Sequence, residues 1–186
     1  YTLLQYNVVT NCNDAGINNL NSALSNISDN TSYNNGIQLR MVHAWNYGQA
    51  ITGMNITNNL FVSKIASQPT LFFRDDSNPF NSFGSANNNY YARPIDNNLT
   101  IVTSVNSVDT DRNLSAWQTL TGQDLNSHTS PVTITNPNDI LFDYNATTSN
   151  KVVSLGPNTY VDVTGATYTG SVTLLPYTSI ILIKTN

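Results

Sequence analysis

Three consecutive charged residues, Arg74, Asp75 and Asp76, carry the side chains best suited to acid–base chemistry on a sugar. Inverting glycosidases place two carboxyl groups about 6.5–9.5 Å apart, and polysaccharide lyases combine a base such as arginine with a group that neutralises the substrate carboxylate. Neighbouring side chains on a strand point to opposite faces, which separates two adjacent carboxylates. We therefore expect a catalytic site if a loop turns both carboxylates the same way, and otherwise an ion pair between Arg74 and one aspartate.

The segment MVHAWNYGQ, residues 41–49, places His43, Trp45 and Tyr47 at alternate positions. On a strand or an extended loop these three side chains share one face. Aromatic rings on an exposed face stack against sugar rings, and histidine supplies hydrogen bonds. The segment predicts a sugar-binding platform; the alternative is that Trp45 and Tyr47 pack against the flank of the fold.

A second candidate sugar site lies in NNNYYARP, residues 87–94. Tyr90 and Tyr91 can stack on sugar rings, and Arg93 can hold the carboxylate of an acidic sugar through a bidentate contact. Adjacent tyrosines on a strand face opposite sides, so we expect one of them to be in the core.

Asp109, Asp111 and Asn113 alternate in the way that oxygen ligands of calcium often do. The segment lacks the turn glycine and the distal glutamate of a calcium loop, and no Glu occurs anywhere in the chain. No cluster of His and Cys has zinc spacing, and no nucleotide-binding motif is present. The sequence predicts no cofactor, with calcium as the one candidate ion.

Composition disfavours two classes of partner. The chain has 186 residues, of which 39% are hydrophobic and 10% charged, and its net charge is -4. These values favour a globular fold and disfavour nucleic acid or an anionic membrane as a partner. Cys12 is the only cysteine, so packing and not disulfides must stabilise the fold. The chain starts YTLLQYN, with no initiator Met or signal sequence, and we expect it to be the carboxy-terminal part of a longer protein.

Similar asparagine-rich segments stand at residues 7–11 (NVVTN), 26–30 (NISDN) and 55–59 (NITNN), with starts 19 and 29 residues apart. Spacings of this size are typical of repeats in which each supersecondary unit stacks on the next. Asparagine tolerates the left-handed backbone of a tight corner, and stacked asparagines form hydrogen-bonded ladders. The segments predict coils of parallel strands; the alternative is a disordered, low-complexity region.

The remaining sequence predicts a helix and an antiparallel unit. In NLSAWQTLTGQD, residues 113–124, apolar residues recur every third position, Asn113 or Ser115 can cap the start and Gly122 can end the helix. Such a helix can cover the open end of the coils. From Pro131, six short stretches (VTIT, ILFDYN, KVVSL, TYVDV, SVTLL and SIILIK) predict a small antiparallel β-sandwich. The predicted domains are 1–130 and 131–186.

The asparagine-cornered repeats resemble right-handed parallel β-helix proteins, which are common among secreted bacterial proteins that process polysaccharides. The tail ILFDYNATTSNKVVSLGPNTYVDVTGATYTGSVTLLPYTSIILIK, preceded by LSAWQTLTGQDLNSH, is similar to the endings of such proteins in Bacteroidetes, where they close accessory sandwiches on glycoside hydrolases. The resemblance implies an all-β chain: a short right-handed parallel β-helix of about three to four coils with a helical cap, followed by the antiparallel sandwich.

The resemblance also implies a function in polysaccharide recognition or processing, outside a bacterial cell or at its surface. The expected partners are a polysaccharide or oligosaccharide and the remaining coils of the parent protein, without membrane insertion. We expect this chain to bind glycan and to cap the solenoid. A lyase or hydrolase whose site is completed by amino-terminal coils is the first alternative, and a structural or adhesive solenoid terminus the second. Whether the chain is itself an enzyme stays open.

Overall fold

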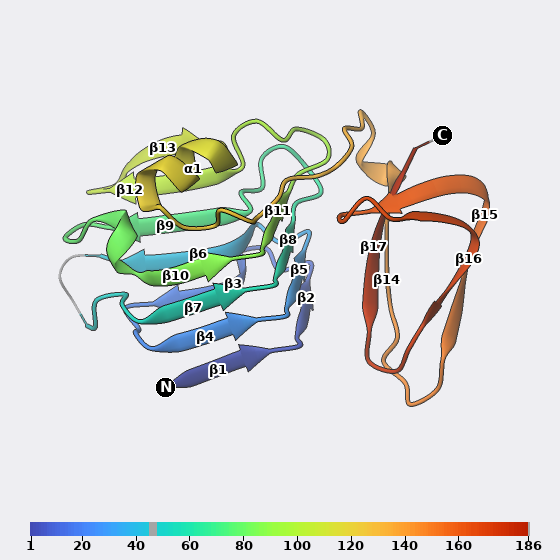
Figure 1. Ribbon diagram of the computed structural model, residues 1–186, viewed down its shortest axis with the longest axis horizontal. Helices are drawn as coiled ribbons and strands as arrows, with labels where there is room; N and C mark the ends of the chain where they lie inside the picture. Colours follow the sequence, from blue (N-terminus) through green and yellow to red (C-terminus); the bar gives the residue numbers. More distant parts are fainter. Residues whose placement is uncertain (45–47, 186) are drawn as a thin grey trace.

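The computed structural model describes residues 1–44 and 48–185. Strands hold 48% of the chain and helices 8%, so the predicted all-β class is confirmed. Figure 1 shows two parts: a stack of strands formed by the earlier residues, and a sheet beside it formed by the last ones. None of the helices in the described ranges is long and apolar enough to cross a membrane.

The stack contains three sheets, here named A, B and C, which the chain visits in turn. Sheet A holds β1 (Thr2–Gln5), β4 (Ser25–Ser28), β7 (Met54–Thr57) and β10 (Gly84–Asn87). Sheet B holds β2 (Val8–Thr10), β5 (Thr31–Tyr33), β8 (Leu60–Val62) and β11 (Tyr90–Ala92). Sheet C holds β3 (Ala15–Leu20), β6 (Ile37–His43), β9 (Leu71–Asp75), β12 (Ile101–Val105) and β13 (Val108–Arg112). All neighbouring strands are parallel except β12 and β13. We call β1–β3, β4–β6, β7–β9 and β10–β12 the three-strand units.

The register of these sheets corrects the alignment that the asparagine segments predict. Asn26 and Asn55 face each other on β4 and β7, but their partner on β1 is Leu3. Asn7 lies beyond the next corner, where its neighbour is Asn30, 23 residues later in the chain. The first spacing is therefore 23 residues and not 19, because register is decided by which side chains point inward along each strand.

Asparagines stack at the corner between sheets A and B. The corner residues Tyr6, Asp29, Asn58 and Asn88 have left-handed φ values of 58°, 57°, 58° and 57°. The next residue is an asparagine each time, and we call these four the asparagine ladder: Asn7, Asn30, Asn59 and Asn89. The backbone N–H and Nδ2 of each of the first three donate to Oδ1 of the next at 2.9–3.1 Å. The predicted stacking of asparagines as a ladder is confirmed at this corner.

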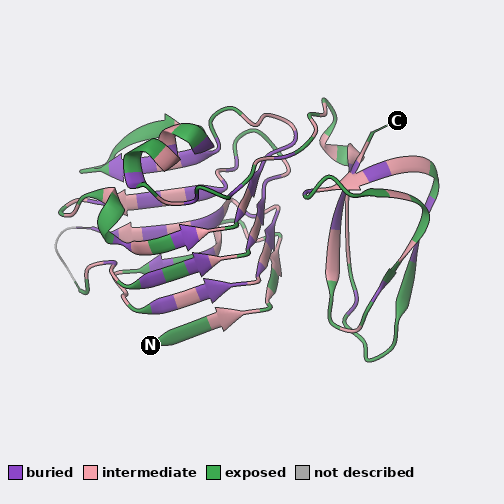
Figure 2. Ribbon diagram, in the orientation of Figure 1, coloured by how far each residue is buried: buried purple, intermediate pink, exposed green. Residues whose placement is uncertain are grey.

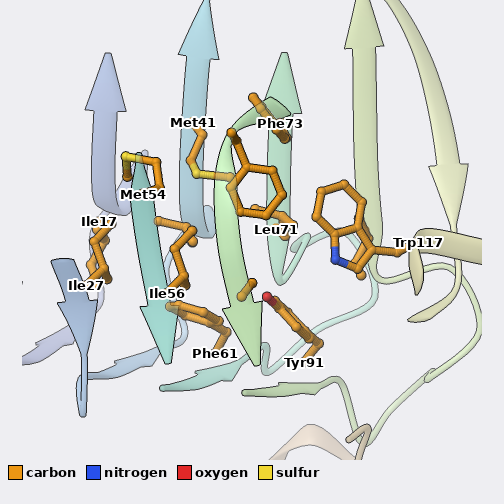
Figure 3. Packing of buried hydrophobic residues seen from close by; sticks show 14 of the residues in the cluster. Ile17, Ile27, Met41, Met54, Ile56, Phe61, Leu71, Phe73, Tyr91 and Trp117 are labelled. Carbon is orange, nitrogen blue, oxygen red and sulfur yellow. The ribbon is translucent and has the colours of Figure 1, made fainter. Parts of the chain in front are cut away.

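The core of the stack is formed by alternate side chains that point between the three sheets. Figure 3 shows this interior, where aliphatic residues of the early units give way to aromatic residues near the later ones. Its buried members include Ile27, Ile56, Phe61, Tyr91, Leu39, Leu71, Phe73 and Ile101. Burial of these apolar surfaces provides the main driving force for stacking the units.

A helix covers the end of the stack formed by β10–β12 (Figure 1). Helix α1 (Leu114–Thr121) starts after Asn113, whose side chain accepts a hydrogen bond from the backbone of the first turn, and ends at Gly122 with φ 68°. Both predicted caps are confirmed. Trp117 is fully buried, and its ring stacks on Phe83 with centroids 6.0 Å apart. Leu120, which the spacing places on the apolar face, is 38% exposed.

The segment after α1 ends the asparagine ladder. Asp124 is fully buried, and its Oδ1 accepts from Asn89 Nδ2 at 3.0 Å and from Ser127 Oγ at 2.6 Å. Its Oδ2 accepts from the Tyr91 hydroxyl at 3.1 Å and from Trp117 Nε1 at 2.8 Å. Burial raises the pKa of Tyr91 well above its usual value, and the Asp124 charge raises it further. The helix, the ladder and the aromatic core thus meet at one carboxylate.

The last part of the chain forms one antiparallel sheet in the order β14, β17, β15, β16, here called the C-terminal sheet. Its strands are β14 (Ile140–Tyr144), β15 (Lys151–Asp162), β16 (Thr167–Leu174) and β17 (Ser179–Lys184). KVVSL and TYVDV, predicted as two strands, join into β15, and the predicted strand VTIT is not a strand. Short 3₁₀ turns stand at Phe80–Ser82 and Pro137–Asp139.

The C-terminal sheet folds over on itself and packs on sheet B. β15 pairs with β17 only at its end, so the β15–β16 hairpin encloses Leu155, Tyr160 and Leu182 against β17. The sequence predicts a small antiparallel β-sandwich in residues 131–186, and the described strands of this region form one antiparallel sheet that folds over on itself. The buried residues of its contact with sheet B are Tyr33, Val62, Ala92, Ile140, Val163 and Ile181, and the partly buried Leu60, Tyr90, Ile134 and Phe142 pack against them.

Candidate functional site

Two aromatic rings lie side by side on the outer edge of sheet B. Tyr90 begins β11, and its ring centroid is 5.4 Å from that of His128, with the planes tilted by 38°. The backbone holds His128 in this position: its N–H donates to Asn89 O at 2.9 Å, and its carbonyl accepts from Tyr91 N at 2.8 Å. The segment at His128 therefore extends sheet B by one parallel bridge beyond β11.

A hollow lies on each side of this ring pair, and together we call them the Tyr90–His128 groove. One hollow, of about 230 Å³, is lined by Asn58, Asn88, Tyr90, Asn126 and His128. The other, of about 290 Å³, is lined by Tyr90, His128, Thr129, Ser130, Pro131, Val163 and Thr164. The groove thus runs from the asparagine corner to the junction with the C-terminal sheet. A larger hollow of about 410 Å³ at residues 132–135 has no aromatic ring among the described residues that line it.

The fold presents amides to this groove at regular intervals. Asn58 and Asn88 occupy equivalent left-handed corners of successive units, so both exposed side chains start from backbones one strand spacing, about 4.8 Å, apart along the stack. Asn126 follows them, because its backbone N–H donates to Asn87 Oδ1 at 2.9 Å. Amide groups both donate and accept hydrogen bonds, and no lysine, arginine or aspartate lines either hollow. The groove combines a ring face with neutral polar groups.

The structure separates the two carboxylates of the predicted catalytic group. Asp76 forms an ion pair with Arg74, with 2.7 Å between Oδ2 and Nη2. Hydrogen bonds to Asp76 raise the pKa of Arg74 above its usual value. Asp75 points into the stack, where it is 2% exposed and accepts from the backbone N–H of Ser77 and Asn78 at 2.9 and 2.8 Å. Of the two predicted outcomes, the geometry favours the ion pair.

The structure places His43, the first residue of the predicted sugar platform, beside this buried carboxylate. Its Nδ1 lies 3.1 Å from Asp75 Oδ1 and 3.3 Å from Asn78 Nδ2, and the residue is 6% exposed. The contact joins β6 to β9 in the interior. Trp45 and Tyr47 lie outside the described residues, so the platform stays a prediction.

The residues of the second predicted sugar site lie in different environments, as the alternation of side chains along a strand requires. Tyr91 is in the core and Tyr90 is on the outer face, which confirms that one of the adjacent tyrosines is buried. Arg93 is 5% exposed, and burial lowers its pKa. Its guanidinium donates to the carbonyl oxygens of Ala66, Asp96 and Leu99 at 2.6–2.9 Å. The N–H groups of the guanidinium thus hydrogen-bond to the carbonyl oxygens of loops, and the geometry leaves none of them for a sugar carboxylate.

One of the three predicted calcium ligands has a structural role. Asp109 and Asp111 lie on the exposed strand β13, and the side chain of Asn113 caps α1 by accepting from Ala116 N at 2.8 Å. Among the described residues, no group of three or more His, Cys or Asp side chains is placed to hold a metal ion. The side-chain oxygen of Asn113 already has a structural partner.

Comparison with known proteins adds no relative: no family model, curated protein or solved structure matches this chain. The groove residues His128, Asn58, Asn88 and Asn126 were not predicted as site residues. The repeated Asn-Asn pairs at 58–59 and 88–89 carry a signal for two of them, because the first of each pair turns outward and the second inward. His128 has no such signal, since a bridge to a distant strand places it.

Proposed function

We propose that this chain is a glycan-binding module and that the Tyr90–His128 groove is its binding site. The observation that carries the proposal is the pair of rings between two hollows lined by amides and hydroxyls. An aromatic face packs against the apolar face of a sugar ring, and amides exchange hydrogen bonds with its hydroxyls. The proposed location, outside a bacterial cell, rests on the sequence resemblance alone.

The ligand that fits this groove is a neutral oligosaccharide. Arg93, the one cation expected to bind an acidic sugar, is buried and bonded to carbonyl oxygens. The linings of both hollows lack lysine and arginine. A bound carboxylate would lose its hydration without gaining a charged partner, which is unfavourable.

The scaffold that we infer is a short right-handed parallel β-helix capped by α1. The inference is supported by the order in which the chain visits sheets A, B and C four times, and by the parallel pairing of all strands that belong to the three-strand units. Right-handed connections are the rule between parallel strands. In this arrangement the groove follows one corner of the helix.

Affinity electrophoresis on a panel of neutral and acidic polysaccharides tests the proposal. We expect retardation by a neutral polysaccharide, and a loss of affinity of about tenfold or more in Tyr90→Ala and in His128→Ala, because the ring contact is removed. His128 is exposed, so its substitution should leave the urea unfolding midpoint nearly unchanged.

Tyr144→Ala is the matched control, because Tyr144 is a 53% exposed tyrosine in the C-terminal sheet, away from the groove lining. It should bind like the unchanged protein. Equal loss in all three variants, or binding confined to acidic polysaccharides, would contradict the proposed site. No binding to any polysaccharide would favour the structural or adhesive alternative. Newly formed reducing ends or unsaturated products in the same samples would favour the enzyme alternative.

A further inference from the structure

One end of the stack consists of unpaired strand edges. Among the described strands, β1, β2 and β3 each have a neighbour on one side only, so about half of their backbone N–H and C=O groups face away from the stack. Leu3, Tyr6 and Leu20 at this end are 55%, 75% and 57% exposed. Figure 2 shows the contrast between the exposed β1 and the buried residues of the strands above it. We call this surface the open end.

The asparagine ladder has a direction, and this direction distinguishes its two ends. Each side-chain oxygen of Asn30, Asn59 and Asn89 accepts from the ladder asparagine on its open-end side, as when Asn7 Nδ2 donates to Asn30 Oδ1 at 2.9 Å. The Nδ2 groups of these three residues also donate to backbone carbonyls of the preceding unit, so the direction is that of the oxygens. At that end the last donor, Asn89 Nδ2, is received by Asp124. At the open end Asn7 Oδ1 is an acceptor, and no described residue donates a hydrogen bond to it.

We propose that the open end is a docking surface for one more parallel three-strand unit, entering from the N-terminal side of the same polypeptide and carrying an asparagine at its first corner. That asparagine would donate its backbone N–H and Nδ2 to Asn7 Oδ1, as Asn7 donates to Asn30. The last strand of such a unit would end close to the start of β1, because consecutive units are joined by a short connection: only residues 21–24 connect β3 to β4.

A second copy of this chain does not satisfy the same surface. A head-to-head copy would place its own Asn7 Oδ1 against this one, so that two acceptors meet, and its strands would run antiparallel to β1. A head-to-tail copy is blocked, because α1 and Asp124 cover the other end of the stack. The inference concerns this surface alone and does not rest on the glycan proposal.

A tandem duplication tests the inference. Adding a copy of residues 2–24 before Thr2 reproduces the 23-residue spacing that separates Asn7 from Asn30. We expect the outward-facing amides of β1 to exchange about tenfold or more slowly than in the unextended chain, and the urea midpoint to rise. The matched variant carries Asn7→Asp in the added copy only, which is isosteric but places a carboxylate oxygen against Asn7 Oδ1.

The outcomes separate clearly. Protection of β1 by the added copy, and weaker protection by the aspartate variant, supports the inference. Equal protection by both copies would show that the ladder does not select the unit, and protection by neither would show that the edge does not accept one. Sedimentation of the unextended chain as a dimer with protected β1 amides would overturn the inference in favour of a second copy.

Discussion

At the scale of single residues, the main feature is a column of buried amides. Asn30, Asn59 and Asn89 are 0–1% exposed, a burial at which an unpaired amide would cost several kcal/mol. Both polar atoms of each side chain are paired. The oxygen accepts two hydrogen bonds from the preceding ladder asparagine, and the nitrogen donates to the next one or, for Asn89, to Asp124. Asparagine suits this place since it carries a donor and an acceptor on one short side chain.

Asn59→Asp should destabilise the protein by about 3 kcal/mol or more, because a carboxylate oxygen would replace the nitrogen that faces three acceptors. Those acceptors are Ile27 O, Thr57 O and Asn89 Oδ1, at 2.8–3.0 Å. Urea unfolding at neutral pH measures the loss. The control is Asn58→Asp, since Asn58 is exposed and aspartate tolerates its left-handed backbone. Equal losses in the two variants would show that the ladder position is not special.

At the scale of elements, α1 is too short to be stable alone and depends on its caps and its tertiary contacts. Asn113 satisfies an N–H of the first turn, Gly122 supplies the left-handed C-cap, and Trp117 joins the helix to the aromatic core and to Asp124. The helix therefore closes the stack through both apolar and polar contacts. Removing either the apolar or the polar contacts of α1 should destabilise the last three-strand unit, β10–β12, before the others.

Asn113→Ala should lower the free energy of unfolding by about 1 kcal/mol, because the first turn loses its side-chain cap. Asn113→Asp should retain most of that stability, since aspartate caps equally well. Both values can be read from urea unfolding with and without calcium. A calcium-dependent rise in stability that disappears in Asn113→Ala would instead assign this residue to a metal site.

At the scale of the whole molecule, an apolar contact joins the stack to the C-terminal sheet. Tyr33 is 4% exposed, and its ring stacks on Phe142 with centroids 4.9 Å apart. Burial raises the pKa of Tyr33 from 10.0 to about 12. Burial at this contact therefore favours the neutral phenol in the folded protein.

Tyr33 makes stability depend on alkaline pH. Between pH 10 and about 12 the unfolded chain has released this proton and the folded protein still holds it, so this contribution is present below pH 10 and is lost as pH rises through the folded pKa. Urea unfolding across this range should show a smaller decline in Tyr33→Phe than in the unchanged protein. Tyr144→Phe, at a 53% exposed position, should keep the full decline. Parallel profiles for Tyr33→Phe and the unchanged protein would refute this assignment.

Local patterns in the sequence were sufficient for the element types. The all-β class, the caps of α1 at Asn113 and Gly122, the burial of one of two adjacent tyrosines and the stacking of asparagines follow from propensities and side-chain alternation among near neighbours. The physical reason is that a cap or a corner is satisfied within a few residues. The antiparallel pairing of the last strands follows in the same way from their short turns.

Only the tertiary structure decided which of these residues meet. In the structure Asn7 lies beside Asn30 and not beside Asn26, and Asp75 lies beside His43. Arg93 donates to carbonyl oxygens, and His128 lies beside Tyr90. Connections between units vary in length, so sequence spacing does not give the register; burial of the inward face and pairing of every buried polar group do. The free energies of this burial and of this pairing depend on residues that are far apart in the chain. A local sequence pattern therefore does not determine them.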